Sequence, residues 1–161
     1  MHAEDRGNQF GDAVYEVCEV QGGRLVDETR HLTRLERSMD ELAIEPPMTM
    51  KALGRVMRET IRRNRVRDGL VYLQVSRGAA PRNFLFPGPE VPPTLIVLAR
   101  RVDKRQADVQ AAEGIAIKTM PENRWGRVDI KTVMLLPSAL PRRRRGPRAP
   151  RKLGSSTGKA G

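Results

Sequence analysis

The sequence of 161 residues predicts an α/β fold, in which strands and helices alternate along the chain. Three patterns support this class: apolar residues with a period of two, apolar residues spaced by three and four, and glycine or proline turns between them. The stretch VYEVCEV, residues 14–20, alternates apolar and polar residues as a half-buried strand does. The following QGGR, residues 21–24, predicts a turn.

Two helices are expected after this first strand. The apolar face of the first helix is spaced by three and four residues and consists of Leu32, Leu35, Met39 and Leu42. Asp27 or Thr29 is available to cap its start, and the EPP sequence at residues 45–47 ends it. The same spacing continues in a second helix from about Thr49 to Arg63.

Three further strands are expected after these two helices. They are LVYLQVS at residues 70–76, TLIVLAR at 94–100 and GIAIKTM at 114–120. A polar segment with the composition of a helix or a linker separates the last two. The polar break at residues 103–107 therefore predicts a domain boundary.

The composition excludes several classes of protein. The longest aliphatic run, LIVLA at residues 95–99, is far too short to cross a bilayer, and the polar N-terminus lacks the pattern of a secretion signal. A single cysteine, Cys18, excludes an internal disulfide and makes a cysteine-based metal cluster implausible. His2 and His31 lack metal-ligand spacing, and His31 is expected on a helix surface. A cytoplasmic protein without a membrane span or metal site is expected.

The net charge of +11 is concentrated at the C-terminus. Residues 141–161 carry eight basic groups and no acid, so that only +3 remains on residues 1–140. Such a tail can bind nucleic acid or anionic surfaces nonspecifically. The body of the chain is nearly balanced in charge and gives no sign of a nucleic-acid site.

Four stretches resemble consecutive landmarks of a known family. They are EDRGNQFGDAVYEV at residues 4–17, HLTRLERS at 31–38, VYLQVSRGAAPRNFLFP at 71–87 and RWGRVDIKTVMLLPSAL at 124–140. In order and spacing they are similar to the class IV aminotransferases, most closely to the D-amino acid aminotransferases. The resemblance implies a transaminase that moves an amino group between a D-amino acid and a 2-oxo acid. Branched-chain aminotransferases and aminodeoxychorismate lyases are the alternatives within the family.

The resemblance also implies a division into domains. Residues 1–104 correspond to the small N-terminal α/β domain of the fold-type IV aminotransferases. Residues 105–140 correspond to the segment between the domains and to the start of the large domain that binds the cofactor. Residues 141–161 have no counterpart and are expected to form a disordered basic tail.

The resemblance assigns four site residues and a cofactor, pyridoxal 5'-phosphate (PLP). Lys131 matches the lysine that forms a Schiff base with PLP, and Arg34 matches the arginine on the cofactor phosphate. Tyr15 matches a tyrosine that faces the substrate, and Arg82 matches the arginine that holds the substrate carboxylate. Family members form homodimers that complete each other's active sites. Without the resemblance, all four would be ordinary strand, helix or loop residues.

Two of the departures from the family pattern bear directly on the expected site. Phe84 stands where the best-known D-amino acid enzymes have a histidine, which removes one donor from the expected carboxylate site. After Leu140 the alanine-rich helix of the family is missing, and Leu153 precedes GSS where the family has a glutamate in EGSS. That glutamate therefore has no counterpart here.

The composition of the tail suggests its origin. All eleven residues from Pro141 to Arg151 are Pro, Arg, Gly or Ala, whose codons can consist of G and C alone. A shifted reading frame in a GC-rich gene produces such a sequence, so residues 141–161 are interpreted as an out-of-frame tail on a truncated enzyme. The alternative function is that of an inactive fragment whose basic tail binds anionic surfaces or nucleic acid.

Overall fold

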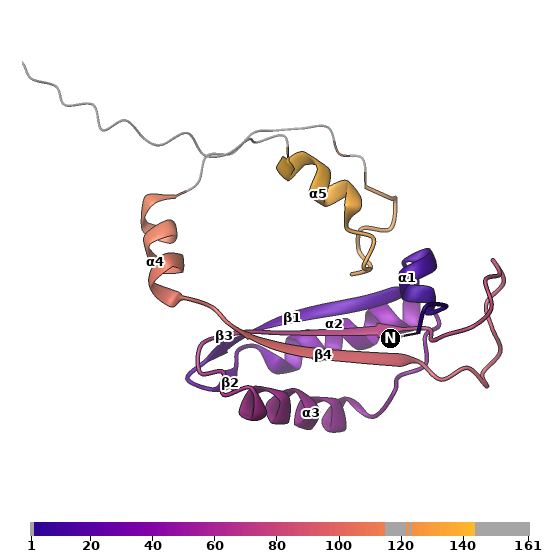
Figure 1. Ribbon diagram of the computed structural model, residues 1–161, viewed down its shortest axis with the longest axis horizontal. Coiled ribbons are helices and arrows are strands. Elements are labelled where there is room, and N and C mark those ends of the chain that lie inside the picture. The colour runs from indigo at the N-terminus through magenta and orange to yellow at the C-terminus, as the bar shows by residue number, and fades with distance from the viewer. Residues whose placement is uncertain (1, 115–121, 123, 144–161) are drawn as a thin grey trace, which may run out of the picture.

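The computed structural model describes residues 2–114, 122 and 124–143, and it confirms the α/β class. Its centre is one antiparallel sheet of four strands in the order β2-β1-β3-β4 (Figure 1). The strands are β1 (Ala13–Gln21), β2 (Arg24–Leu25), β3 (Gly69–Ser76) and β4 (Thr94–Arg101). The strands expected at residues 14–20, 70–76 and 94–100 are thus confirmed. The strand expected at 114–120 falls almost entirely outside the described residues.

Two helices, α2 (Glu28–Glu41) and α3 (Met50–Arg63), cover one face of this sheet (Figure 1). Their apolar faces meet the inward-pointing residues of β1 and β3. The largest fully buried apolar side chains come from both layers: Leu35, Met39, Leu53, Met57, Leu73, Val14, Val20, Val71 and Val75. The spacing of three and four residues therefore predicted both helices and the faces that they bury.

The two helix starts differ in their capping. Thr49 caps α3, because its hydroxyl oxygen accepts a hydrogen bond from the amide of Ala52 at 3.2 Å. Asp27 occupies the cap position of α2, but its backbone is left-handed, with φ of 53°, and its side chain makes no capping hydrogen bond. Of the two expected capping residues, Asp27 is thus at the cap position, without the expected bond.

Three shorter helices complete the described chain. Helix α1 (Arg6–Phe10) was not expected, and Asp5 caps it by accepting a hydrogen bond from the amide of Gly7. Helix α4 (Lys104–Glu113) fills most of the polar break expected as a boundary and buries none of its residues. Helix α5 (Leu136–Arg143) extends three residues into the expected tail; residues 144–161 lie outside the described part of the chain.

The outer edge of β1 has no strand beside the first half of its length. Strand β2 is so short that it pairs only with Val20 and Gln21. The edge that it leaves free pairs instead with a segment more than a hundred residues later, through a bridge between Val14 and Thr132. The amide of Val133 donates to the carbonyl of Ala13 at 3.1 Å in the same place. This pairing fixes the position of the residues around 131.

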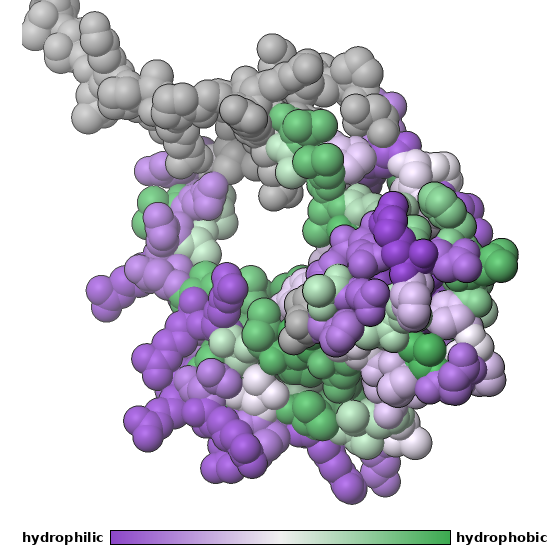
Figure 2. All heavy atoms as spheres, turned by 45° about the vertical axis from the view of Figure 1, so that its right-hand side comes forward, coloured by the Kyte–Doolittle hydropathy of each residue, from purple (hydrophilic) through white to green (hydrophobic). Residues whose placement is uncertain are grey.

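The sheet face opposite α2 and α3 is only partly covered. Leu70 of β3 and Leu98 of β4 are exposed there. Apolar side chains gather in the middle of the face shown in Figure 2, and hydrophilic side chains surround them. Among the described residues, no helix has the length and apolar character needed to cross a membrane.

Candidate functional site

A cavity of about 230 Å³ lies beside the open edge of β1 and brings together three of the four predicted site residues. Tyr15 reaches it from β1, Arg34 from α2, and Lys131 from the segment that pairs with β1. The other lining residues belong to the last described part of the chain: Arg124, Trp125, Val128, Asp129, Ile130, Thr132, Met134, Leu135 and Ser138. The cavity is smaller than the usual 300–1,000 Å³ of small-molecule pockets. It can therefore enclose only part of a ligand of cofactor size.

Lys131 is held in the cavity by its own backbone. Its carbonyl accepts a hydrogen bond from the amide of Tyr15 at 3.0 Å, which continues the ladder along the edge of β1. The preceding residue, Ile130, is buried and belongs to the hydrophobic core. Ile130 is fixed in the core and the Lys131 backbone is paired with β1. The Lys131 side chain therefore lines the cavity.

Tyr15 forms the wall next to the lysine. The Nζ atom of Lys131 lies 4.2 Å from the centre of the Tyr15 ring, a cation–π distance. The Tyr15 ring is itself stacked on Tyr72, with 5.6 Å between ring centres. The Tyr15 ring therefore has Tyr72 beside it and presents an aromatic face to the amine.

Arg34 is oriented by a buried carboxylate that the sequence prediction missed. The Arg34 guanidinium donates from Nε to Glu16 Oε1 at 2.6 Å and from Nη2 to Oε2 at 2.7 Å. Glu16 is fully buried, whereas the Arg34 side chain is 49% exposed. The Nδ1 atom of His31 lies 2.7 Å from Glu16 Oε2. His31 is thus a partner of the carboxylate as well as a residue at the helix surface.

These contacts set the protonation states of Glu16 and Arg34. Burial raises the pKa of the Glu16 carboxyl, but the hydrogen bonds and charges of Arg34 and His31 outweigh this effect and lower the pKa below its ordinary value. The hydrogen bonds to Glu16 raise the pKa of Arg34 in return. Glu16 is therefore a carboxylate at neutral pH, and Arg34 a cation.

The sequence contained a signal for Glu16. Alternation along β1 places Glu16 in phase with Val14, Cys18 and Val20, on the face that packs against α2. An acid in phase with buried apolar residues needs a cationic partner. Arg34 and His31, three residues apart on one side of the expected helix, were the available candidates.

Two ion pairs fasten the lysine segment to α2. Arg37 donates to Asp129 at 3.0 Å, and Arg127 donates to Glu41 at 2.6 Å. The hydrogen bonds from Arg127 to Asp129 join the two pairs into one network. These side chains are about half exposed, so their contribution lies in holding the segment in register rather than in stability.

Arg82, the fourth predicted site residue, lies elsewhere. It belongs to the loop between β3 and β4, is exposed, and is not among the residues that line the cavity. Its guanidinium lies over the ring of Phe10 at 4.9 Å from the ring centre. Within one chain, Arg82 and Lys131 are therefore parts of different surfaces.

The chemistry of the cavity fits a phosphorylated aldehyde. Glu16 holds Nε and Nη2 of Arg34, and in the described part of the chain no hydrogen bond engages its Nη1. This leaves part of a fixed guanidinium at the cavity, where it can donate to a phosphate oxygen. Lys131 supplies an amine in the same cavity, the group that reacts with an aldehyde.

The sequence matches the family Amino-transferase class IV over residues 13–150. The match ends ten residues beyond Leu140, where the tail is expected to begin. D-alanine aminotransferase from Staphylococcus haemolyticus is 39% identical over 137 residues, which are 85% of this chain and 48% of that protein. The chain thus spans about half the length of the curated relatives that it matches.

Solved structures show the same arrangement of elements. The 4-amino-4-deoxychorismate lyase from Pseudomonas aeruginosa superposes with a TM-score of 0.56 and 28% identity, over 68% of this chain and 40% of that one. A hypothetical aminotransferase from Mycobacterium tuberculosis in its PLP-bound form gives a TM-score of 0.56 and 25% identity, over 69% of this chain and 37% of the other. The chain belongs to the class IV aminotransferases, a PLP-dependent family.

Proposed function

We propose that the chain is part of a PLP-dependent transaminase that moves an amino group between a D-amino acid and a 2-oxo acid, and that it contributes residues to the PLP site. The observation that carries this proposal is the placement of Lys131 and Arg34 on one cavity, the amine on the β1 side and the guanidinium on α2. The relatives support the D-amino acid branch, since the curated protein with 39% identity is a D-alanine aminotransferase. We expect the enzyme to act in the cytoplasm.

Each cavity residue has a distinct task in this proposal. Arg34, held by Glu16, binds the cofactor phosphate. Lys131 would hold the cofactor, and its Nζ would carry a proton to and from the substrate α-carbon. PLP, when bound, supplies the conjugated ring that stabilises negative charge at that carbon. Tyr15 lies against Nζ and limits the directions from which a substrate can approach.

Arg82 is proposed to bind the substrate carboxylate. It lies outside the cavity of its own chain, so this role would require a homodimer in which each chain contributes to its partner's site. A guanidinium suits a carboxylate because its donors form a fixed fork. Phe84, next to it in the loop, offers no donor, so Arg82 would act without the histidine found in the best-known enzymes of this branch.

The domain division is also proposed. We assign residues 1–104 to the small domain and residues 105–140 to the connection and the start of the large domain. The fold supports this division, because α4 buries none of its residues against the sheet layer. Branched-chain aminotransferases and aminodeoxychorismate lyases remain the alternatives, since the cavity residues that we assign act on the cofactor rather than on the substrate side chain.

Covalent trapping tests the proposed role of Lys131. The full chain is incubated with PLP, reduced with borohydride, digested, and examined by mass spectrometry. The phosphopyridoxyl group is expected on the peptide that contains Lys131, and Lys131→Ala should abolish it. Lys51→Ala, which removes a lysine of α3 far from the cavity lining, is the matched control. Equal labelling of several surface lysines, unaffected by Lys131→Ala, would contradict the proposal.

A further inference from the structure

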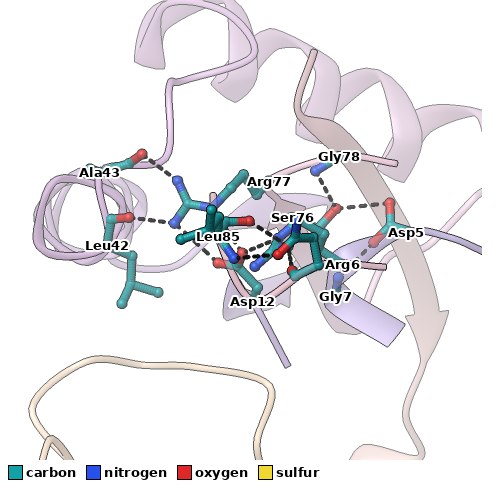
Figure 3. Close-up of polar contacts among 11 residues, drawn as sticks. Asp5, Arg6, Gly7, Asp12, Leu42, Ala43, Ser76, Arg77, Gly78 and Leu85 are labelled. Carbon is teal, nitrogen blue, oxygen red and sulfur yellow. Dashed lines mark hydrogen bonds and ion pairs between the residues drawn. The ribbon is translucent and has the colours of Figure 1, made fainter. Parts of the chain in front are cut away.

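A second group of buried charges joins three parts of the fold (Figure 3). Arg6 of α1, Asp12 before β1 and Arg77 after β3 form what is called here the arginine cluster. Both arginines donate from Nε to Asp12 Oδ2 at 2.8 Å, and Arg77 also donates from Nη2 to Oδ1 at 3.1 Å. All three side chains are at most about a tenth exposed. Two cations thus share one anion in the interior.

The remaining donors of the cluster bind backbone carbonyls from distant segments. Arg77 donates to the carbonyls of Leu42 and Ala43 at the end of α2, at 2.5 and 2.6 Å. Arg6 donates from Nη1 to the carbonyls of Asn83 at 2.7 Å and Leu85 at 3.3 Å. These bonds satisfy buried guanidinium groups that would otherwise be costly. They also link the body of the fold to the loop that carries Arg82.

The loop has little else to order it. Phe84, Leu85 and Phe86 are 85%, 75% and 63% exposed, so apolar burial contributes little to its conformation. The ring of Phe86 covers both guanidiniums of the cluster, 3.9 Å from Arg77 and 5.5 Å from Arg6. The contacts of this loop with the rest of the described chain are therefore mostly contacts with the cluster.

Phe10 connects the cluster to Arg82 directly. The guanidinium of Arg6 lies 4.5 Å from the centre of the Phe10 ring, and that of Arg82 lies 4.9 Å from it. The Phe10 and Phe84 rings pack edge to face, with 5.7 Å between their centres. The position of Arg82 thus depends on a ring that is itself placed by Arg6. A displacement of Arg6 would therefore break its hydrogen bonds to the loop and would also free the Phe10 ring that contacts Arg82.

We propose that the arginine cluster is a positioning device that fixes residues 82–86, and with them Arg82, in one conformation. Arg6, Asp12, Arg77 and Phe86 are then positioning residues for the group that meets the substrate carboxylate. The last step rests on the proposed function of Arg82, whereas the ordering of the loop does not.

Backbone ¹⁵N relaxation of the full chain, without added cofactor, tests the inference. In the wild type, the order parameters of residues 83–86 are expected near the rigid value of about 0.85. Phe86→Ala removes the ring over the guanidiniums, and these values should fall below about 0.6, while the thermal midpoint stays unchanged because the side chain is mostly exposed. Phe86→Tyr, which keeps the ring, should restore them. Arg6→Lys, which loses the forked donors, should lower the order parameters of residues 83–86 in the same way.

Arg37→Lys is the control for the same substitution, because Arg37 forms an ion pair with Asp129 from α2, on the surface and away from the loop. It should leave residues 83–86 rigid. A loop already mobile in the wild type, or one that stays rigid in both Arg6→Lys and Phe86→Ala, would overturn the inference. Since no cofactor takes part, this outcome is independent of the trapping of PLP on Lys131, and either proposal can fail alone.

Discussion

Replacing Glu16 by glutamine is expected to destabilise the fold measurably, although the side chain keeps its shape. Glu16 is fully buried and accepts two hydrogen bonds from Arg34, and bonds to charged groups are worth about 1.5–3 kcal/mol each. The amide still accepts one bond, and the half-exposed Arg34 regains water, so the lower end of the range applies. The expected loss is about 2 kcal/mol.

Urea unfolding followed by circular dichroism measures this loss. With a slope of about 2 kcal/mol per molar urea, the midpoint should fall by about 1 M while the slope stays constant. Glu59→Gln is the matched control, because Glu59 also pairs with arginines but on the exposed surface of α3. Its midpoint should barely move. Equal midpoints for the two variants would refute the claim that Glu16 anchors Arg34 in the interior.

The difference in unfolding free energy between the wild type and Glu16→Gln is expected to depend on pH. The folded pKa of Glu16 lies below its unfolded value of about 4.3, so the ionised carboxylate contributes stability that is present above this pH. That contribution is lost as the pH falls through the folded pKa. The difference in unfolding free energy between wild type and Glu16→Gln should therefore be constant near neutral pH and shrink below about pH 4.

Four other predictions follow from local geometry, charge and the composition of the tail. Gly78→Ala should cost about 2 kcal/mol in urea unfolding, because its φ of 105° and the nearby carbonyl of Pro92 leave no place for a methyl group. Burial and the charges of Glu16 and Glu28 raise the pKa of Cys18 to about 12, so the thiol should react with iodoacetamide at pH 8 only after unfolding. Deleting residues 141–161 should abolish salt-sensitive DNA binding, and binding that survives would place a nucleic-acid site in the body. Sequencing the gene should recover family-like sequence when the frame is shifted by one nucleotide after Leu140.

The elements that could be predicted from sequence are those with long periodic patterns. Helices α2 and α3 each contain fourteen residues, and the apolar spacing of each determines the face that it buries. Helix α1 contains five residues, too few for a pattern, and depends on Asp5, whose carboxylate also accepts a hydrogen bond from Ser76. Ser76 is seventy-one residues from Asp5 in the sequence, so no local sequence pattern predicts the contact that holds this helix.

The candidate site likewise has features that the sequence predicts and features that only the structure shows. The motif around Lys131 was recognised because its neighbours match the family, and the structure places it beside Tyr15 through a single strand pairing. The pairing itself could not be predicted, because it depends on how short β2 is. Arg82 was also assigned by its motif, yet no sequence pattern could tell that it lies outside the cavity of its own chain.

Comparison of pyridoxal phosphate with pyridoxal tests the central claim most directly, namely that Lys131 and Arg34 serve one ligand. Equilibrium binding is followed by absorbance for the wild type and for Arg34→Ala. The wild type should prefer the phosphorylated compound by about tenfold, the lower end of a charge-assisted hydrogen bond at a half-exposed guanidinium. Arg34→Ala should bind both compounds equally. A wild type without this preference, or a preference that survives Arg34→Ala, would contradict the shared site.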